Sequence, residues 1–325
     1  MRIIDVMLCF PFYVLALSVM AFLGNSLAHL IMIITFFTFA PSARLIRMEV
    51  LAIKDREFIQ ICRINGETGT SADTLLVHDI NFSIGEGQTL AIAGESGSGK
   101  TLTALAIMGL LDRSAFAVQG SCSFFPRCAA TADQPDQPLD FFTLTEKERK
   151  TLCLEEIAMI YQNPFRSLSP VETIKTHIKH ICAIKRRQLD SEWLYTLFDA
   201  VQLEREEMLG KYPHELSGGE LQRIMLVLAI LFKPRLLICD EPTASLDYQT
   251  GKLIVSLLKH LKEINGMSLL FISHDISLVR DIADAVIIMK NGRIVETGAA
   301  EHIFTRSKET YTQQLIQAAY LEKSC

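Results

Sequence analysis

The octapeptide GESGSGKT, residues 94–101, restricts the fold of this chain more than any other feature of its sequence. The strand-like run TLAIAG leads into it, and the helix-patterned run LTALAIMGLL follows it. A strand, a glycine-rich loop and a helix in this order match G-x-x-x-x-G-K-[ST], in which backbone N–H groups surround phosphates at a helix N-terminus. An ordinary glycine turn can carry the same short pattern. In this context, however, the octapeptide predicts a nucleoside triphosphate site on an α/β fold.

The residues of this loop have separate expected roles. Lys100 would reach the β- and γ-phosphates, and Thr101 would hold Mg²⁺. The other six would bring backbone N–H groups to the phosphates: Gly94, Glu95, Ser96, Gly97, Ser98 and Gly99. The predicted cofactors are therefore ATP and Mg²⁺.

Two further strand-like runs end in residues that suit phosphate hydrolysis. RLLICDEP, residues 235–242, contains Asp240, placed to bind the Mg²⁺ shell, and Glu241, placed to polarise the attacking water. An acid pair beside a proline is also common at a solvated helix start. SLLFISHD, residues 268–275, contains His274, which can hydrogen-bond a γ-phosphate or that water, although a histidine at a strand end is more often merely exposed.

A second helix start with anion-binding character lies between these two runs. KYPHELSGGELQR, residues 211–223, contains a Ser-Gly-Gly turn before the apolar helical run ELQRIMLVLAILF. Backbone N–H groups at such a helix N-terminus favour anions. The chain thus has two predicted phosphate-binding helix ends.

Six phrases of the chain, in their order, resemble the ATP-binding-cassette (ABC) family: GESGSGKT, YQNPFRSLSP, LSGGE, LLICDEP, ASLD and ISHD. The resemblance implies an α/β P-loop NTPase (RecA-like) fold with an inserted helical subdomain at about 165–225. In that family two cassettes face each other head to tail, and the LSGGE signature of one closes over the nucleotide held by the P-loop of the other. A lone copy is therefore not expected to turn over ATP efficiently.

Carried over residue by residue, the resemblance assigns further roles. Gln162 is expected to sense Mg²⁺ and the membrane partner, Glu241 to act as the catalytic base, and His274 to act as the switch histidine. Contacts across the pair of cassettes are expected from four residues: Ser217, Gly218, Gly219 and Asp247. Contacts to Mg²⁺ are expected from Thr101, Gln162 and Asp240.

The chain departs from the family pattern in two places. The signature ends in Glu220 where glutamine is commonest, and little loss is expected because Ser217 and the backbone N–H groups remain. The segment GETGTSADTLL, residues 66–76, lacks the aromatic residue that usually stacks on adenine. Stacking is worth about 1 kcal/mol, so weaker ATP affinity, or stacking by another residue, is expected.

The phrases YQNPFRSLSP, KYPHELSGG and KETYTQQLIQAA are similar to those of the peptide and nickel importer branch, over residues 75–320. The tail has Cys325 alone instead of the cysteine cluster of many oligopeptide members, which favours dipeptide, nickel or metallophore import. The implied partners are a second ATPase subunit, identical or different, permease subunits and an extracytoplasmic substrate-binding protein. We expect an ATP-hydrolysing subunit that powers import of peptides or of nickel or another metal chelate.

The N-terminal region predicts a membrane hairpin. Residues 6–43 contain no Asp, Glu, Lys or Arg, and two spans of about 20 residues fit, with a break near Gly24. Arg2 precedes the spans, and Arg44 and Arg47 follow them, so both ends are expected in the cytosol. A cleaved signal peptide and a buried pair of soluble helices are the alternatives. The chain is thus expected at the cytoplasmic membrane, with its ATPase domain on the cytoplasmic side.

The same region resembles the permease subunit of these importers, chiefly in EFIQICRING, so the chain looks like a truncated permease joined to its neighbouring ATPase. The expected domains are a permease-like hairpin and loop at 1–66, an ABC ATP-binding domain at 67–300 and a helical tail at 301–325. An alternative start of the cassette at Met48 would make EVLAIKD its first strand and LLVHDINFSI the next.

Composition disfavours other classes of function. The chain has 32 Lys+Arg against 37 Asp+Glu, a net charge of −5, which gives no electrostatic reason for a nucleic-acid partner. Its eight scattered cysteines form no C-x-x-C pair and are expected to be reduced thiols. Two alternative functions remain open: a soluble ABC ATPase that transports nothing, and a membrane-tethered remnant that binds ATP without transport.

Overall fold

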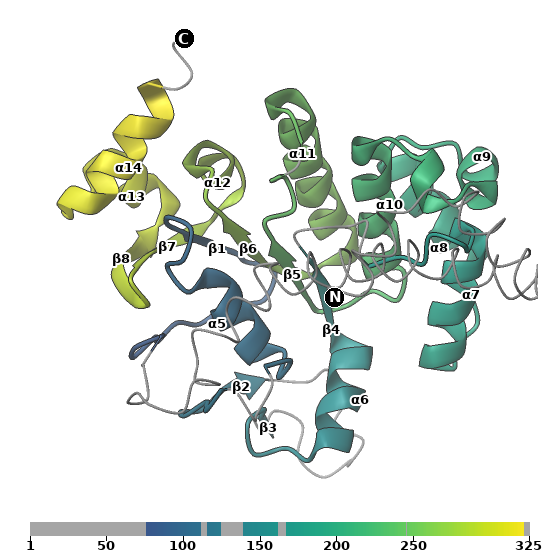
Figure 1. The fold of residues 1–325 in the computed structure, drawn as a ribbon, viewed down its shortest axis with the longest axis horizontal. Helices are drawn as coiled ribbons and strands as arrows, with labels where there is room; N and C mark the ends of the chain where they lie inside the picture. Colours follow the sequence, from purple (N-terminus) through teal and green to yellow (C-terminus); the bar gives the residue numbers. More distant parts are fainter. Residues whose placement is uncertain (1–75, 112–115, 125–138, 162–166, 245, 322–325) are drawn as a thin grey trace, which may run out of the picture. The chain divides into compact units, whose positions relative to one another are not determined.

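The computed structural model describes residues 76–111, 116–124, 139–161, 167–244 and 246–321 (Figure 1). Three predicted features lie outside these ranges: the hairpin and permease-like loop at 1–66, residues 66–75 of the segment that lacks an adenine-stacking aromatic, and Gln162. Those predictions stay predictions. Within the described ranges, no helix is both long enough and apolar enough to cross a membrane.

A six-stranded sheet in the order β4-β5-β6-β1-β7-β8 organises the described residues (Figure 1). The strands are β1 (Thr89–Ala93), β4 (Ile157–Ile160), β5 (Leu236–Asp240), β6 (Ser268–Ser273), β7 (Ala285–Lys290) and β8 (Arg293–Ala299). Neighbours are parallel except β7 and β8, which are antiparallel. Parallel strands buried on both faces require continuous apolar runs. The strands predicted from TLAIAG, RLLICDEP and SLLFISHD are accordingly present as β1, β5 and β6.

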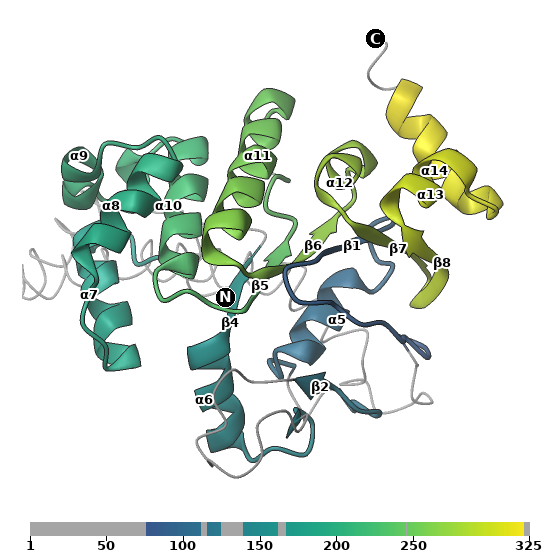
Figure 2. The same cartoon turned by 180° about the vertical axis from the view of Figure 1, so that it is seen from behind.

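Alternate residues of each strand pack into separate cores on the two faces of the sheet, because successive side chains of a strand point in opposite directions. In β1, Ala91 and Ala93 join the larger core, and Leu90 and Ile92 join the smaller one. Three helices follow β1, β5 and β6: α5 (Lys100–Ile107), α11 (Tyr248–Asn265) and α12 (Ile276–Ile282). Helices α11 and α12 cover the larger core and α5 covers the smaller one (Figures 1 and 2).

Helices that follow β4 form a helical subdomain at one end of the sheet. They are α7 (Ile174–Lys185), α8 (Ser191–Ala200), α9 (Arg205–Gly210), the short 3-10 helix η2 (Pro213–Glu215) and α10 (Gly218–Ile230). Side-chain caps begin α7, α8 and α10, since Thr173 Oγ1 accepts a hydrogen bond from Thr176 N–H, Asp190 Oδ1 accepts one from Trp193 N–H and Ser217 Oγ accepts one from Glu220 N–H. Because α10 packs against β4, the subdomain lies at the β4 edge.

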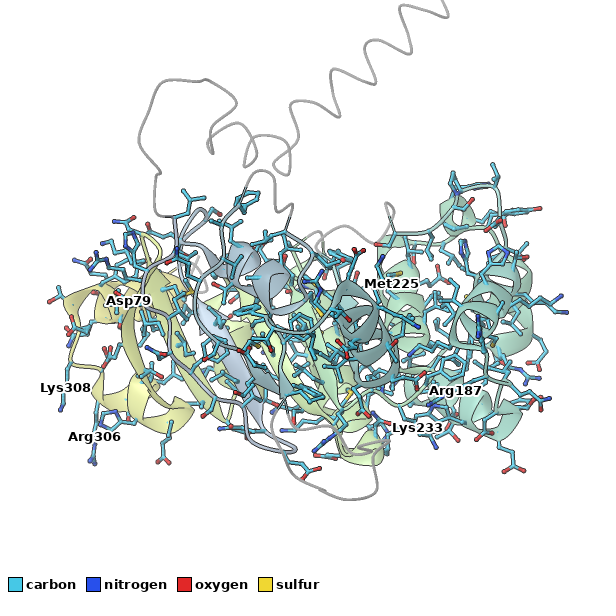
Figure 3. All side chains as sticks on the ribbon, turned by 90° about the horizontal axis from the view of Figure 1, so that it is seen from below. Asp79, Arg187, Met225, Lys233, Arg306 and Lys308 are labelled. Carbon is cyan, nitrogen blue, oxygen red and sulfur yellow. The ribbon has the colours of Figure 1, made fainter. Side chains whose placement is uncertain are left out.

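The other end of the sheet carries the C-terminal helices α13 (Ala300–Arg306) and α14 (Thr310–Leu321). Helix α13 contacts β7 and β8, and α14 contacts α12. In Figure 3, Arg306 and Lys308 mark this end, and Arg187 and Lys233 mark the end with the helical subdomain. A small sheet and a helix complete the described elements on the α5 side: β2 (Ser123–Phe124), β3 (Leu139–Asp140) and α6 (Glu146–Glu156).

The segment before β1 differs from one expectation. The described part of LLVHDINFSI, residues 76–84, forms no strand, although its likeness to a family strand predicts one. Asp79 has a φ of +44°, which interrupts an extended run. The segment instead contacts the turn between β7 and β8, where His78 N–H donates to Gly292 O at 2.7 Å.

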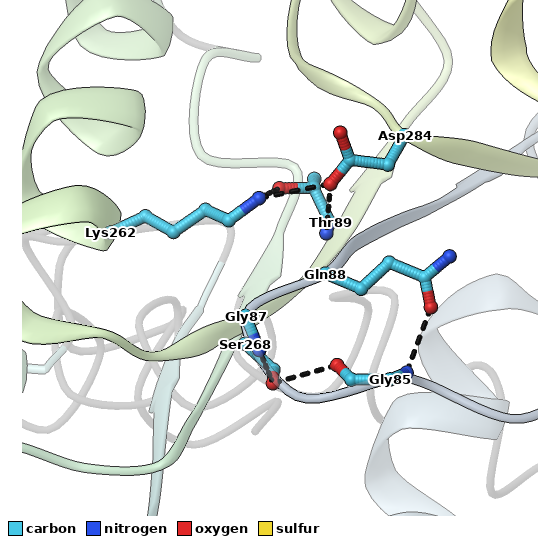
Figure 4. A network of polar contacts seen from close by, with 7 residues as sticks. All are labelled: Gly85, Gly87, Gln88, Thr89, Lys262, Ser268 and Asp284. Atoms are coloured by element: carbon cyan, nitrogen blue, oxygen red, sulfur yellow. Dashed lines mark hydrogen bonds and ion pairs between the residues drawn. The ribbon is translucent and has the colours of Figure 1, made fainter.

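Polar side chains join several elements where β1 begins (Figure 4). Asp284 Oδ2 accepts hydrogen bonds from Thr89 N–H at 2.7 Å and from Lys262 Nζ at 2.9 Å. Ser268 Oγ donates to Gly85 O at 3.0 Å nearby. Burial alone would raise the pKa of the Asp284 carboxyl, but the Thr89 N–H and the Lys262 ammonium outweigh burial and hold that pKa below its ordinary value. These contacts connect β1, β6, α11 and the start of β7.

Candidate nucleotide site

The loop that follows β1, which we call the P-loop (residues 94–101), has a backbone suited to glycine. The φ angle is +151° at Gly94, +80° at Gly97 and +99° at Gly99. A Cβ on Gly94 would lie 2.1 Å from the backbone oxygen of Met289 in β7 and would overlap it. Glycine at residue 94 therefore lets the P-loop pack directly against β7.

Helix α5 presents its first turn to the P-loop. Gly99 is its N-cap residue, and no side chain among the described residues caps the helix. The first N–H groups of an α-helix have no partners within the helix, and the helix dipole gives this end positive character. The P-loop and the first turn of α5 thus provide the donors that a phosphate requires.

Lys100 is folded back over the P-loop. Its Nζ donates to Gly94 O at 2.9 Å and to Glu95 O at 2.8 Å, and the residue is 4% exposed. Burial lowers the pKa of the Lys100 ammonium. The carboxylates of Glu241, Asp240 and Glu95 oppose this lowering of the pKa. A bound phosphate would replace the two carbonyl oxygens as the partner of the ammonium group.

Thr101 contacts the first acid at the end of β5. Its Oγ1 donates to Asp240 Oδ1 at 3.1 Å, and Asp240 is 2% exposed. No group of three or more His, Cys, Asp or Glu side chains that could hold a metal ion occurs among the described residues. One hydroxyl and one carboxylate nevertheless fit Mg²⁺ bound together with a nucleotide, because Mg²⁺ prefers oxygen ligands and takes its remaining ones from water and phosphate.

Glu241 and His274 meet at the ends of β5 and β6. His274 Nδ1 lies 3.2 Å from Glu241 Oε2, with 51% of the histidine side chain and 12% of the glutamate side chain exposed. Glu241 has a φ of +48°, and its N–H donates to Ile272 O at 2.9 Å. Such a backbone is strained for a residue other than glycine and persists where surrounding contacts hold it, often at functional sites. The two side chains can together hold and deprotonate a water molecule.

Ser217 and Glu220 form a capping box at the start of α10, within the signature LSGGE. Glu220 Oε2 accepts hydrogen bonds from Ser217 Oγ at 2.6 Å and from Ser217 N–H at 2.8 Å. The Ser217 hydroxyl and N–H hold the pKa of the Glu220 carboxyl below its ordinary value. A phosphate that binds at this helix start would have to take Ser217 from Glu220.

Asp247 lies beside the same helix start. It is the N-cap residue of α11, and its carboxylate accepts from Thr250 Oγ1 at 2.7 Å and from Gln249 N–H at 3.0 Å. A Cβ on Gly219 would lie 3.1 Å from Thr250 Cγ2. The starts of α10 and α11 are therefore neighbours.

The predicted site residues fall into two groups in the described structure. One group surrounds the P-loop: Lys100, Thr101, Asp240, Glu241 and His274. The other lies at the starts of α10 and α11: Ser217, Gly218, Gly219 and Asp247. Strands β6 and β5 separate β1, which precedes the P-loop, from β4, on which α10 packs. At ~4.8 Å between strands, this separation is about 14 Å.

The sequence did not predict that the C-terminal helix α14 contacts the P-loop. The hydroxyl of Tyr311, in α14, accepts a hydrogen bond from Glu95 N–H at 3.3 Å. The phrase KETYTQQLIQAA contains Tyr311 and suggested a family branch, but it suggested no role for this residue. A tyrosine in a C-terminal helix carries no local sign of contact with a loop 216 residues earlier.

Comparisons with known proteins agree with this architecture. The family model described as ABC transporter matches residues 77–244. The chain is 38% identical to the peptidoglycan transport ATP-binding protein YejF of Agrobacterium fabrum, over 76% of its own length but only 44% of that relative. It is 36% identical to the dipeptide transport ATP-binding protein DppD of Escherichia coli, over 76% of its own length and 73% of that relative.

A solved structure supports the fold independently. The cbiO1 protein of Clostridium perfringens, part of the ABC transporter complex cbiONQ, superposes with a TM-score of 0.58 over 77% of this chain and 93% of that one. Their sequences are 22% identical, so this likeness concerns the fold alone. The predicted α/β P-loop fold is confirmed.

Proposed function

The chain belongs to the ABC transporter family, and from this premise we propose that it is the ATP-hydrolysing subunit of an importer at the cytoplasmic membrane. The hydrogen bond between Thr101 Oγ1 and Asp240 Oδ1, 3.1 Å long, carries the proposal. This contact joins the P-loop to the acids at the end of β5. Glu241 is the next residue in the chain, and its carboxylate is 3.2 Å from His274 Nδ1.

Each residue near the P-loop has a chemical role in this proposal. Lys100 exchanges its two carbonyl partners for the β- and γ-phosphates. Glu241 accepts a proton from the attacking water, and His274 holds that water or a γ-phosphate oxygen. Thr101 and Asp240 would hold Mg²⁺, which neutralises phosphate charge when it is bound.

A second cassette is part of the proposed active unit. Helix α10 packs on β4, which lies about 14 Å across the sheet from β1, the strand that precedes the P-loop. This separation supports contact of the start of α10 with the phosphates of another chain rather than with those of its own. A head-to-tail pair would bring Ser217, Gly218 and Gly219 of one copy to the nucleotide of the other. Asp247 is next to this helix start and would contact the partner copy as well.

We propose peptides as the class of cargo. YejF is named for peptidoglycan transport and DppD for dipeptide transport, and the chain covers most of DppD. Permease subunits and an extracytoplasmic substrate-binding protein are the proposed further partners. Nickel or metal-chelate import, and the permease-like hairpin at 1–66, stay predictions from the sequence.

Two measurements, made one after the other, test the proposal. The full-length chain, purified in mild detergent, should release phosphate from ATP, and chelation of Mg²⁺ should stop the release. Expression in cells that lack the ATPase subunit of a dipeptide importer should restore growth on a dipeptide. If no phosphate is released at any of the protein concentrations tested, the ATPase role is contradicted. If phosphate is released but the cells do not grow, the dipeptide importer role is contradicted.

A further inference from the structure

Helix α14 contacts the P-loop through the side chain of Tyr311. Tyr311 is 9% exposed, and its hydroxyl accepts a hydrogen bond from the Glu95 N–H at 3.3 Å. The same peptide unit, between Gly94 and Glu95, has its carbonyl oxygen 2.9 Å from Lys100 Nζ. Tyr311 and Lys100 therefore hold the two polar ends of a single peptide unit. Because a peptide unit is planar, fixing its N–H also orients its C=O.

The hairpin of β7 and β8 also contacts the P-loop, at Ser98. Gly292 N–H, in the turn of that hairpin, donates to Ser98 O at 3.0 Å. Lys290 Nζ, at the end of β7, lies 4.1 Å from the centre of the Tyr311 ring, a cation–π contact. Elements from the C-terminal part of the chain thus hold both the P-loop and the tyrosine that contacts it.

The segment before α14 is itself fixed to β8. Glu296 Oε1 accepts a hydrogen bond from Lys308 N–H at 2.9 Å, and Glu296 Oε2 accepts one from Ser307 Oγ at 3.0 Å. Thr312, which follows Tyr311, has no exposed surface, and Ile316 packs against the larger core. The Tyr311 ring is therefore held in place by packing, so its hydroxyl is already positioned before a nucleotide binds.

We propose that Tyr311 is a positioning residue for the P-loop: its hydroxyl orients the Gly94–Glu95 peptide and, through it, Lys100. This inference rests on the proposed ATP site and adds a residue of the tail to it. Loss of the hydroxyl would free the peptide to rotate, and part of the binding free energy of ATP would then be needed to order the P-loop. By reciprocal linkage, anything that displaces α14 would weaken ATP binding.

The test removes the hydroxyl and keeps the ring. In the full-length chain, Tyr311→Phe should weaken binding of a fluorescent ATP analogue by roughly three- to tenfold, the size expected for one hydrogen bond. The KM for ATP should rise by a similar factor, while kcat should change by less than about twofold because the hydrolytic groups are untouched.

Two matched variants separate positioning from general stability. Gln314→Ala alters an exposed residue of the same helix and should change nothing. Ile316→Ala removes packing of α14 but keeps the hydroxyl, so it should lower Tm more than Tyr311→Phe does. The inference is overturned if Tyr311→Phe binds the analogue as tightly as the parent does. It is also overturned if Tyr311→Phe and Ile316→Ala show the same loss of affinity for each degree by which Tm falls. A parent chain that binds no ATP would overturn the proposed function as well, so the two failures are distinguishable.

Discussion

Lys100 and Ser217 both have strong hydrogen-bond partners within the chain. Lys100 Nζ donates to Gly94 O and Glu95 O, and both Ser217 donors bind the Glu220 carboxylate. Nucleotide binding would thus exchange hydrogen bonds rather than add them, and affinity depends on the difference between the two sets. From sequence, Glu220 is expected to matter little, but its capping box gives it a direct part in how readily Ser217 becomes available.

At this residue scale, Glu241→Gln tests the assignment of the base. The variant keeps the shape of the side chain and loses the proton acceptor, so we expect ATP affinity within about threefold of the parent and turnover lower by at least about 100-fold. Fluorescent-nucleotide titration and phosphate release measure the two quantities. The control is Glu263→Gln, which alters an exposed acid on α11. Parent turnover in Glu241→Gln would remove Glu241 from the base role.

At the scale of elements, the P-loop packs closely against one strand of the sheet, β7. Gly94 packs against the backbone of β7, so the P-loop position depends on where β7 lies in the sheet. At the opposite end of β1, the contacts of Asp284 join β1 to the start of β7 and to α11. The two ends of β1 are therefore both connected to β7, one by packing and the other by charge.

The packing contact predicts a difference between two glycine substitutions. Gly94→Ala combines a positive φ with overlap of Met289 O at 2.1 Å, whereas at Gly97 a Cβ would meet nothing within 4 Å. Strain from φ alone costs on the order of 1–3 kcal/mol at either residue. We expect Gly94→Ala to lower the free energy of unfolding clearly more than Gly97→Ala does. Urea denaturation followed by fluorescence of Trp193, the single tryptophan, measures both; equal losses would contradict the role of β7 contact.

The hydrogen bonds of the charged Asp284 side chain predict that the free energy of unfolding depends on pH. Because the Asp284 pKa is held below its ordinary value of 3.8, the carboxylate stabilises the fold at pH well above 3.8, and this contribution disappears as pH falls below 3.8 through the folded-state pKa. Asp284→Asn should therefore be less stable than the parent at pH 7, by about 1 kcal/mol for a partly exposed charged hydrogen bond.

The difference between parent and Asp284→Asn should shrink steadily as the pH falls below 3.8. Urea denaturation at several pH values measures it. Asp199→Asn, which alters an exposed residue of α8, is the control and should show no such trend. A difference that stays constant with pH would show that Asp284 acts through its shape and not its charge.

At the scale of the whole molecule, the order of strands separates the two groups of predicted site residues. The P-loop follows β1, the signature helix α10 packs on β4, and β6 and β5 lie between these strands. Figures 1 and 2 both show α5 and α10 apart on the two sides of the sheet's centre. A second copy of a cassette is the simplest source of the missing phosphate contacts.

Mixing two inactive variants tests this pairing. Lys100→Ala removes the phosphate contact of the P-loop, and Ser217→Arg blocks the signature. A mixed pair would contain one intact site, made by the P-loop of one variant and the signature of the other. Equal amounts should therefore regain up to about one quarter of the parent rate of phosphate release, because half of the randomly formed pairs are mixed and each has one site of two. No gain over the separate variants would contradict a shared site.

The amino-acid sequence alone indicated the strands β1, β5 and β6, the P-loop and the identity of the groups around it. Strands buried on both faces need continuous apolar runs, and a phosphate loop needs glycines with positive φ. The sequence shows both features because each requirement acts within a few neighbouring residues. The predicted strand at residues 76–84 is absent because Asp79 and the β7–β8 turn hold that segment in another conformation.

The tertiary structure alone decided which of these segments are neighbours. It placed β6 between β1 and β5, Thr101 against Asp240 across 139 residues, and Tyr311 against Glu95 across 216. It also placed two strands between β1, which precedes the P-loop, and β4, on which the signature helix packs. Such pairings depend on how whole elements pack and share hydrogen bonds, and side-chain periodicity within one element carries no information about its distant partner.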